Sequence, residues 1–129
     1  MTARTPKVLV MDDEAGIRDI LSLMLSARGV YVETAGEGSE ALEKYRKALR
    51  EGHRFDVVIL DLTVPVGLGG IETMEQLLAI DPGARGIVAS GYSNDTIMSD
   101  YRKYGFSGVM AKPFVISDLC ELIISLMED

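Results

Sequence analysis

The chain has 129 residues, a length typical of one domain, so a single fold must provide both the hydrophobic core and the function. Its net charge of −7 argues against direct binding to nucleic acid or to an anionic membrane surface. The single cysteine excludes an intramolecular disulfide, and no apolar run has the length of a membrane-spanning helix. We therefore expect a cytoplasmic protein that contacts neither nucleic acid nor membrane.

Short apolar runs, rich in β-branched residues, alternate along the chain with segments of helical period. The expected strands are residues 7–11, 30–35, 56–60, 86–90 and 108–112. Apolar residues recur every three or four positions after the first, second and fifth strands, with Ser39 and Ser117 near two of the helix starts. Weaker helical patterns cover residues 72–80 and 95–104.

Three of the expected strands are almost continuously apolar, which is typical of a parallel sheet buried on both faces. Five strand–helix pairs joined by right-handed crossovers predict an α/β fold of the (βα)5 type. This is a doubly wound, flavodoxin-like parallel sheet of five strands in the order 2-1-3-4-5. Residues 1–6 are expected to form an N-terminal tail and residues 7–129 the domain. Ligands of such folds bind beyond the carboxyl ends of the strands.

Acidic residues follow two of these strand ends. Asp12, Asp13 and Glu14 come after the first strand, and Asp61 comes after the third. Mutual repulsion would push protons onto such a cluster, so it predicts either a hard-metal site or an acid–base device, and we favour the metal. Capping of the next helix explains the pair Asp12 and Asp13 equally well. It does not explain Asp61, because no helical pattern begins at Leu62.

Donor groups end two further strands at the same rim. Ser90 closes the fourth strand, and Lys112 followed by Pro113 closes the fifth. Taken singly, a serine there is usually a turn residue and a lysine a solvated surface group. No comparable residue follows the second strand, the edge strand of this topology. The combined pattern of acids, hydroxyl and ammonium on one rim predicts a single functional site.

With these residues the chain resembles the receiver domain of two-component response regulators over residues 7–128. The resemblance implies that Asp61 is the phosphoacceptor. It also implies a site for Mg²⁺, with Mn²⁺ as a substitute, formed by Asp13, Asp61 and the backbone carbonyl of Thr63. Asp12 is expected to act mainly through a metal-bound water.

The same resemblance assigns contacts with the phosphoryl group to Ser90 and Lys112, and a cis bond to Lys112 and Pro113. It implies a domain that catalyses its own phosphorylation and dephosphorylation and that associates with itself weakly or not at all. The only histidine, His53, lies in a polar stretch before the third strand, so an internal phosphohistidine is excluded. The expected partner is therefore a histidine kinase or a histidine phosphotransfer domain.

Two positions depart from the common family pattern. The loop at residues 64–70 is one residue longer than the usual form and rich in glycine. Val109, three residues before Lys112, stands where response regulators often have an aromatic switch residue, which leaves Tyr92 as an alternative cover for the site. Residues 89–93 and 105–108 resemble the receivers at the C-terminal end of hybrid sensor histidine kinases. The alternatives are a free-standing receiver and an inactive receiver-like binding module.

Two enzyme classes with related folds or chemistry fit less well. A flavodoxin needs a phosphate-binding loop after the first strand, where residues 12–14 would repel the flavin phosphate. A phosphatase of the haloacid dehalogenase type needs a general acid two residues after its aspartyl nucleophile. That position is Thr63, which cannot serve as the acid.

Overall fold

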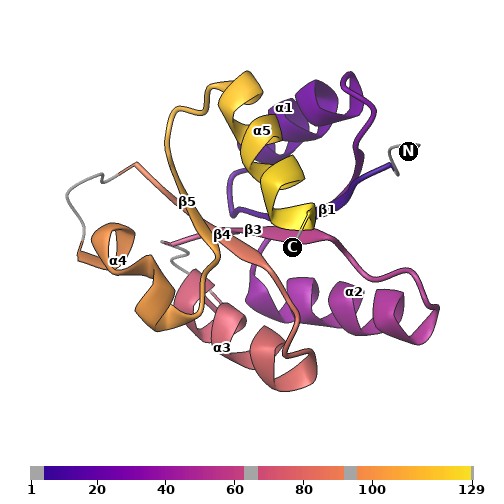
Figure 1. Ribbon diagram of the computed structural model, residues 1–129, viewed down its shortest axis with the longest axis vertical. Coiled ribbons are helices and arrows are strands. Elements are labelled where there is room, and N and C mark those ends of the chain that lie inside the picture. Colours follow the sequence, from indigo (N-terminus) through magenta and orange to yellow (C-terminus); the bar gives the residue numbers. More distant parts are fainter. Residues whose placement is uncertain (1–4, 63–66, 92–95, 129) are drawn as a thin grey trace.

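A computed structural model describes residues 5–62, 67–91 and 96–128 (Figure 1). In chain order the elements are β1 (Lys7–Met11), α1 (Ala15–Ser26), β2 (Tyr31–Ala35), α2 (Gly38–Arg50), β3 (Val57–Asp61), α3 (Gly70–Ile80), β4 (Gly86–Ser90), α4 (Thr96–Ser99), the 3-10 helix η1 (Tyr101–Tyr104), β5 (Gly108–Ala111) and α5 (Ile116–Met127). No helix within these ranges is long and apolar enough to cross a membrane.

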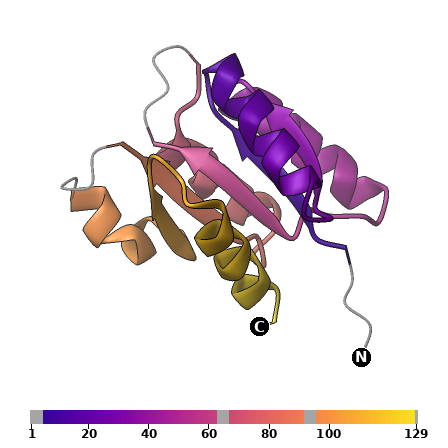
Figure 2. The same cartoon turned by 90° about the horizontal axis from the view of Figure 1, so that it is seen from above.

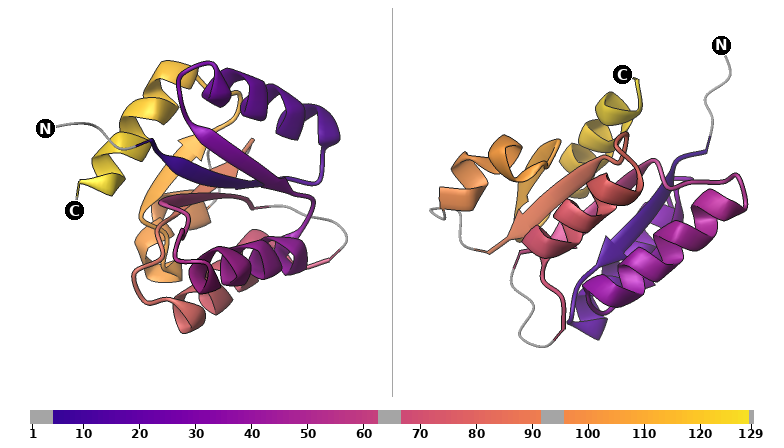
Figure 3. Two further views of the ribbon diagram at one scale, coloured as in Figure 1. Left: turned by 90° about the vertical axis from the view of Figure 1, so that its right-hand side faces the viewer. Right: turned by 90° about the horizontal axis from the view of Figure 1, so that it is seen from below.

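The five strands form one parallel sheet in the order β2-β1-β3-β4-β5, which confirms the predicted topology. Helices α1 and α5 cover one face of the sheet, and α2 and α3 cover the other (Figures 1 and 3). Seen from above, α1 and α5 lie in front of the twisted strands (Figure 2). The sheet is therefore sandwiched between two helical layers.

The hydrophobic core has one half on each face of the sheet, because successive side chains of a strand point to opposite faces. In β1, Val8 and Val10 pack with α1 and α5, whereas Leu9 and Met11 pack with α2 and α3. All five residues of β3 and of β4 are buried. This two-sided burial explains why those strands appear in the sequence as continuous apolar runs.

Serines lie near the starts of two helices, as expected, but neither serine is the N-cap, and the course of a third helix differs from the expectation. The N-cap of α2 is Glu37, whose carboxylate accepts hydrogen bonds from the amides of Ser39 and Glu40, so Ser39 is not the cap. The N-cap of α5 is Val115, and Ser117 lies within the first turn. The helix expected over residues 95–104 is divided into α4 and η1 at Asp100, where serine and aspartate are weak helix formers that compete for backbone hydrogen bonds.

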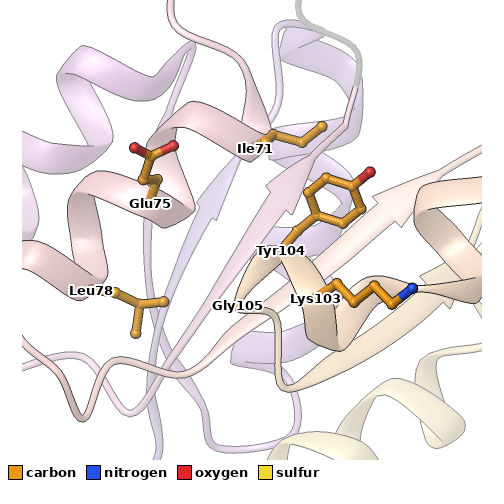
Figure 4. A pocket seen from close by; sticks show the side chains of 6 residues that line it. All are labelled: Ile71, Glu75, Leu78, Lys103, Tyr104 and Gly105. Atoms are coloured by element: carbon orange, nitrogen blue, oxygen red, sulfur yellow. The ribbon is translucent and has the colours of Figure 1, made fainter.

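The surface between α3 and η1 is hollowed by a pocket of about 400 Å³. Its lining residues are Ile71, Glu75 and Leu78 of α3 and Lys103, Tyr104 and Gly105 at η1 (Figure 4). Gly105 ends η1 in the left-handed region at a φ of 90°, and a Cβ there would lie 2.5 Å from Cδ1 of Leu78. Glycine at this position therefore permits both the turn and the close approach of η1 to α3.

A buried tyrosine ties α2 to the turn before β4. Tyr45 is fully buried beside Phe55, and its hydroxyl donates to Oδ2 of Asp81 at 2.6 Å, while Arg54 donates to the same oxygen at 2.9 Å. Burial raises the pKa of Tyr45, and the bond to Asp81 raises it further. Burial alone would raise the pKa of Asp81, but hydrogen bonds from Tyr45 and Gly83 and the charge of Arg54 outweigh it and lower that pKa.

We expect Tyr45→Phe to lower the free energy of unfolding by about 2 kcal/mol at pH 7, because the hydrogen bond from a buried hydroxyl to a charged carboxylate is lost. A depressed carboxyl pKa stabilises the fold above the unfolded value of about 3.9 and loses that effect as the pH falls through the folded value. The difference between wild type and variant should therefore shrink near pH 3. Urea unfolding at both pH values measures it, and a difference independent of pH would contradict the role of Asp81.

Candidate functional site

The carboxyl ends of β1 and β3 bring three acids together. The two strands are adjacent and parallel, with Met11 opposite Leu60, so the residues that follow each lie at the same edge of the sheet. One carboxylate oxygen from each of Asp12, Asp13 and Asp61 lies within 4.8 Å of the other two. Asp12 is 3% exposed and Asp61 6%, whereas Asp13 is exposed to solvent. Two buried acids and one open acid thus share one site.

Asp12 is fixed on several sides. Its amide donates to the carbonyl of Ala35 at 3.0 Å, and its own carbonyl accepts from the guanidinium of Arg18 at 2.7 Å. Its Oδ1 accepts the amide of Glu14 at 3.0 Å. Glu14, and neither Asp12 nor Asp13, is the N-cap residue of α1, and the Glu14 side chain makes no capping hydrogen bond. Neither acid is therefore the N-cap residue that the alternative explanation of the pair assumed.

Lys112 enters the acidic cluster from the end of β5. Its Nζ lies 2.8 Å from Oδ2 of Asp12 and 3.3 Å from Oδ1 of Asp61. The bond between Lys112 and Pro113 is cis, as the resemblance implied. Burial alone would lower the pKa of Lys112, but its hydrogen bond to Asp12 and the charges of Asp61 and Asp12 outweigh that effect and raise the pKa. The ammonium therefore stays charged at neutral pH between two buried carboxylates.

Ser90 completes the described part of this rim. It is buried at the end of β4, and its carbonyl accepts the amide of Lys112 at 2.9 Å. In the neighbouring strand Asp61 lies opposite Ala89, one residue before Ser90. The sheet thus brings the ends of β1, β3, β4 and β5 to one edge, as predicted. Thr63 and Tyr92, which the sequence also pointed to, lie outside the described residues.

Sequence reasoning missed two side chains that support the site. Arg18 binds the carbonyl of Asp12, and Glu37 binds the amide of Leu68 in the connection between β3 and α3. Both contacts involve backbone atoms of the partner, which leave no pattern of paired side chains in a sequence. The available signals are a basic residue one turn into the helix after the acidic pair, and an acid at the start of α2.

The family model for the response regulator receiver domain matches residues 8–124. The chain belongs to this family. It is similar to sporulation initiation phosphotransferase F of Bacillus subtilis, with 30% identity over 91% of this chain and 90% of that protein. It is also similar to the chemotaxis protein CheY of Thermotoga maritima, with 32% identity over 91% of this chain and 93% of that receiver.

Solved receiver structures agree with the fold. CheY4 of Vibrio cholerae superimposes with a TM-score of 0.84 at 30% identity, covering 95% of this chain and 99% of that one. CheY in the CheX-CheY-BeF₃-Mg²⁺ complex from Borrelia burgdorferi superimposes with a TM-score of 0.83 at 25% identity, covering 94% of this chain and 88% of that one. The correspondence therefore extends over nearly the whole receiver.

The acidic cluster has the chemistry of a hard-metal site. Its three converging donors are all carboxylate oxygens, the ligands that Mg²⁺ prefers. The exposed Asp13 leaves the cluster open to solvent on one side, from which a hydrated ion can enter. The described residues therefore fit a small divalent cation.

We expect Mg²⁺ to raise the melting temperature of this receiver, because the ion relieves repulsion that exists only in the folded state. At about 100 times its dissociation constant, a ligand specific for the folded state contributes about 2.7 kcal/mol. Asp13→Ala should remove most of this gain at the same Mg²⁺ concentration, whereas Asp19→Ala, an exposed acid within α1, should keep it. Thermal unfolding with and without Mg²⁺ tests this; equal gains in wild type and Asp13→Ala would place the ion elsewhere.

Proposed function

We propose that this receiver takes a phosphoryl group from a phosphohistidine onto Asp61, with Mg²⁺ as the metal. The observation that carries the proposal is the ammonium of Lys112 held between Asp12 and Asp61 at a buried rim beside the open carboxylate of Asp13. Phosphoryl transfer requires positioning and neutralisation of charge more than covalent chemistry from the protein. A carboxylate nucleophile, an ammonium and a cation site supply these together.

Each residue has a distinct part in the proposed reaction. An oxygen of ionised Asp61 attacks phosphorus, the new P–O bond forms as the P–N bond to the histidine breaks, and the imidazole leaves with the electron pair of that bond. Lys112 transfers its contact from the carboxylate to an oxygen of the arriving phosphoryl group. The hydroxyl of Ser90 donates to another of these oxygens. Burial of Asp61 limits access of bulk water to the acyl phosphate that results.

Asp12, Asp13 and Asp61, with the backbone carbonyl of Thr63, are the groups that would hold the metal. When bound, Mg²⁺ supplies charge neutralisation for the phosphoryl oxygens. Mn²⁺, which accepts the same oxygen ligands, is the expected substitute. In this proposal Asp12 contributes mainly through a water of the ion, which agrees with the engagement of its own oxygens by Glu14 and Lys112.

The phosphodonor is a separate histidine kinase or histidine phosphotransfer domain in this proposal. Helix α1 begins three residues after Asp12 and presents Ile20, Leu23 and Met24 to solvent at helical spacing, with Leu23 73% exposed. An exposed apolar stripe of this kind is typical of a protein contact surface. We assign the docking of the donor to this stripe. The domain then needs no self-association, nucleic acid or membrane, and it acts in the cytoplasm.

Two parent contexts remain in the proposal. Residues 89–93 and 105–108 favour the receiver of a hybrid sensor histidine kinase. A free-standing receiver is favoured by the alignment with sporulation initiation phosphotransferase F and CheY over at least nine-tenths of their lengths. Sequencing the gene on both sides of the segment that encodes this chain decides between them, because a hybrid kinase would be encoded in the same reading frame. The phosphoacceptor chemistry is the same in both.

Incubation of the chain with acetyl phosphate and Mg²⁺, followed by intact-mass spectrometry, tests the proposal. We expect one phosphoryl group per chain, and suppression of the reaction by a chelator, because the carboxylates then repel the incoming group. An unmodified chain under these conditions would leave the inactive binding module as the better interpretation. Steady hydrolysis of phosphomonoesters would instead favour a phosphatase.

A further inference from the structure

The carboxylate of Glu37 binds three backbone amides from two parts of the chain. It accepts hydrogen bonds from the amides of Ser39 and Glu40, the second and third residues of α2, both at 2.9 Å. It also accepts the amide of Leu68 at 3.1 Å. The first two bonds cap a helix, but the third crosses to the connection that leads from Asp61 to α3.

The backbone on both sides fits closely around this contact. The amide of Gly38 donates to the carbonyl of Leu68 at 2.8 Å, so Leu68 is held through both of its polar backbone atoms. Gly67 has a φ of 96°, and a Cβ there would lie 2.7 Å from Oε1 of Glu37. A Cβ on Gly38 would lie 2.8 Å from the carbonyl oxygen of Leu68. Glycine at these two positions lets the two segments approach, and Glu37 fastens them.

The fastened segment packs against the backbone of the proposed phosphoacceptor. Gly70, two residues beyond Leu68, packs so closely on β3 that a Cβ there would lie 2.6 Å from the carbonyl oxygen of Asp61. The other end of the connection is fixed as well, because the amide of Leu62 donates to the carbonyl of Ala89 at 2.9 Å. The backbone from Leu68 to Gly70 is therefore held between Glu37 on one side and Asp61 on the other.

We propose that Glu37 is a positioning residue for Asp61: through the amide of Leu68 it holds residues 67–70 against the end of β3 and thereby sets the rate at which Asp61 is phosphorylated. This inference rests on the proposed function. Reactions that depend on alignment lose rate when a supporting contact lets the reacting group shift by a fraction of an ångström. The bonds from Ser39, Leu68 and Glu40 lower the pKa of Glu37, so it is an ionised acceptor at neutral pH.

The chain offers variants that separate the helix cap from the contact with Leu68. Glu37→Asp retains a favoured N-cap residue but shortens the side chain by one methylene, so the reach to Leu68 is lost. Glu40→Ala removes a second carboxylate from the same turn of α2, one that binds the amide of Gly36 and pairs with Lys44. It is the matched control, because it changes the charge and the helix start without changing the acceptor of Leu68.

The experiment measures three quantities for each variant: the urea midpoint of unfolding, hydrogen exchange of the Leu68 amide by NMR, and the initial rate of labelling by acetyl phosphate with Mg²⁺. For Glu37→Asp we expect a midpoint close to that of the wild type, exchange at Leu68 faster by about tenfold, and labelling slower by about tenfold. For Glu40→Ala we expect exchange at Leu68 and labelling at the wild-type rates.

Wild-type labelling kinetics in Glu37→Asp, or unchanged exchange at Leu68, would overturn the positioning role while leaving the proposed function intact. An equal loss of labelling in Glu40→Ala would also overturn it, because the effect would then belong to the start of α2. Absence of labelling in the wild type itself would overturn the proposed function, and the role of Glu37 with it. The two failures are therefore distinguishable by the wild-type measurement.

Discussion

Asp61→Asn should abolish labelling of the chain by acetyl phosphate, with a loss of rate at least on the order of 10³-fold. The amide has nearly the shape of the carboxylate, but it lacks the anionic oxygen that attacks phosphorus. It also removes one of the two carboxylates that hold Lys112, at 3.3 Å. Intact-mass spectrometry over a time course, in the presence of Mg²⁺, gives the rate for wild type and variant.

Asp56→Asn is the matched control for this measurement. Asp56 is a buried acid immediately before β3, at the opposite end of the strand from Asp61, and its carboxylate accepts the amide of Lys7 at 2.8 Å. An asparagine retains an oxygen for that bond, so we expect labelling at the wild-type rate. Continued single labelling of Asp61→Asn would show that another residue is the phosphoacceptor. Loss of labelling in Asp56→Asn would show that the loss in Asp61→Asn reflects a folding defect.

Most of the strands were predictable because they are short, largely apolar runs. The bounds expected for residues 7–11 and 86–90 are those observed. The third strand was expected to end at Leu60 but continues to Asp61, which lies opposite Ala89 in the ladder. In a sequence, a charged residue suggests that a buried strand has already ended. Here Asp61 still belongs to β3 and is its last paired residue. The phosphoacceptor proposed for this chain is thus fixed by the sheet itself.

The helix expected over residues 95–104 shows where periodicity fails. The apolar spacing correctly indicated a segment with one face on the core, where Met98 is buried. It could not distinguish one helix from α4 followed by η1, because both geometries place residues three apart on the same side. The division at Asp100 depends on local backbone hydrogen bonds, such as that from Lys103 to the carbonyl of Asp100 at 2.9 Å.

The site was predictable to the extent that strand ends place residues at one edge of a sheet. That rule placed the three acids, Ser90 and Lys112 together, but it gave no distances. It did not show that Lys112 lies nearer to Asp12 than to Asp61, at 2.8 Å and 3.3 Å. This difference follows from the paths of the backbone after β1, β3 and β5, which a sequence pattern does not contain.

The position of Lys112 leads to a second large expected effect. Asp12 and Asp61 are both buried, and the ammonium lies between them with its own side chain only 20% exposed. Removing one partner from a buried ionic group leaves charge without compensation and typically costs 3–5 kcal/mol. In Lys112→Met, whose side chain has a similar length without the charge, we expect the free energy of unfolding without divalent cations to fall by about 3 kcal/mol. Urea unfolding measures the change.

Lys103→Met is the control. The side chain of Lys103 is 79% exposed, and its Nζ lies 4.0 Å from Oδ2 of Asp100. Loss of such an exposed ion pair should change the free energy of unfolding by less than about 0.5 kcal/mol.

Lys112→Met also tests whether the ammonium and a divalent cation use the same carboxylates. In the wild type, Lys112 already neutralises part of the charge of Asp12 and Asp61, so Mg²⁺ relieves only the remainder. In Lys112→Met the ion takes the place of the missing ammonium at these two acids, and it should restore most of the lost stability. The gain from saturating Mg²⁺ should thus be larger in the variant than in the wild type. Equal gains in the two proteins would show that the metal and the ammonium act on separate charges.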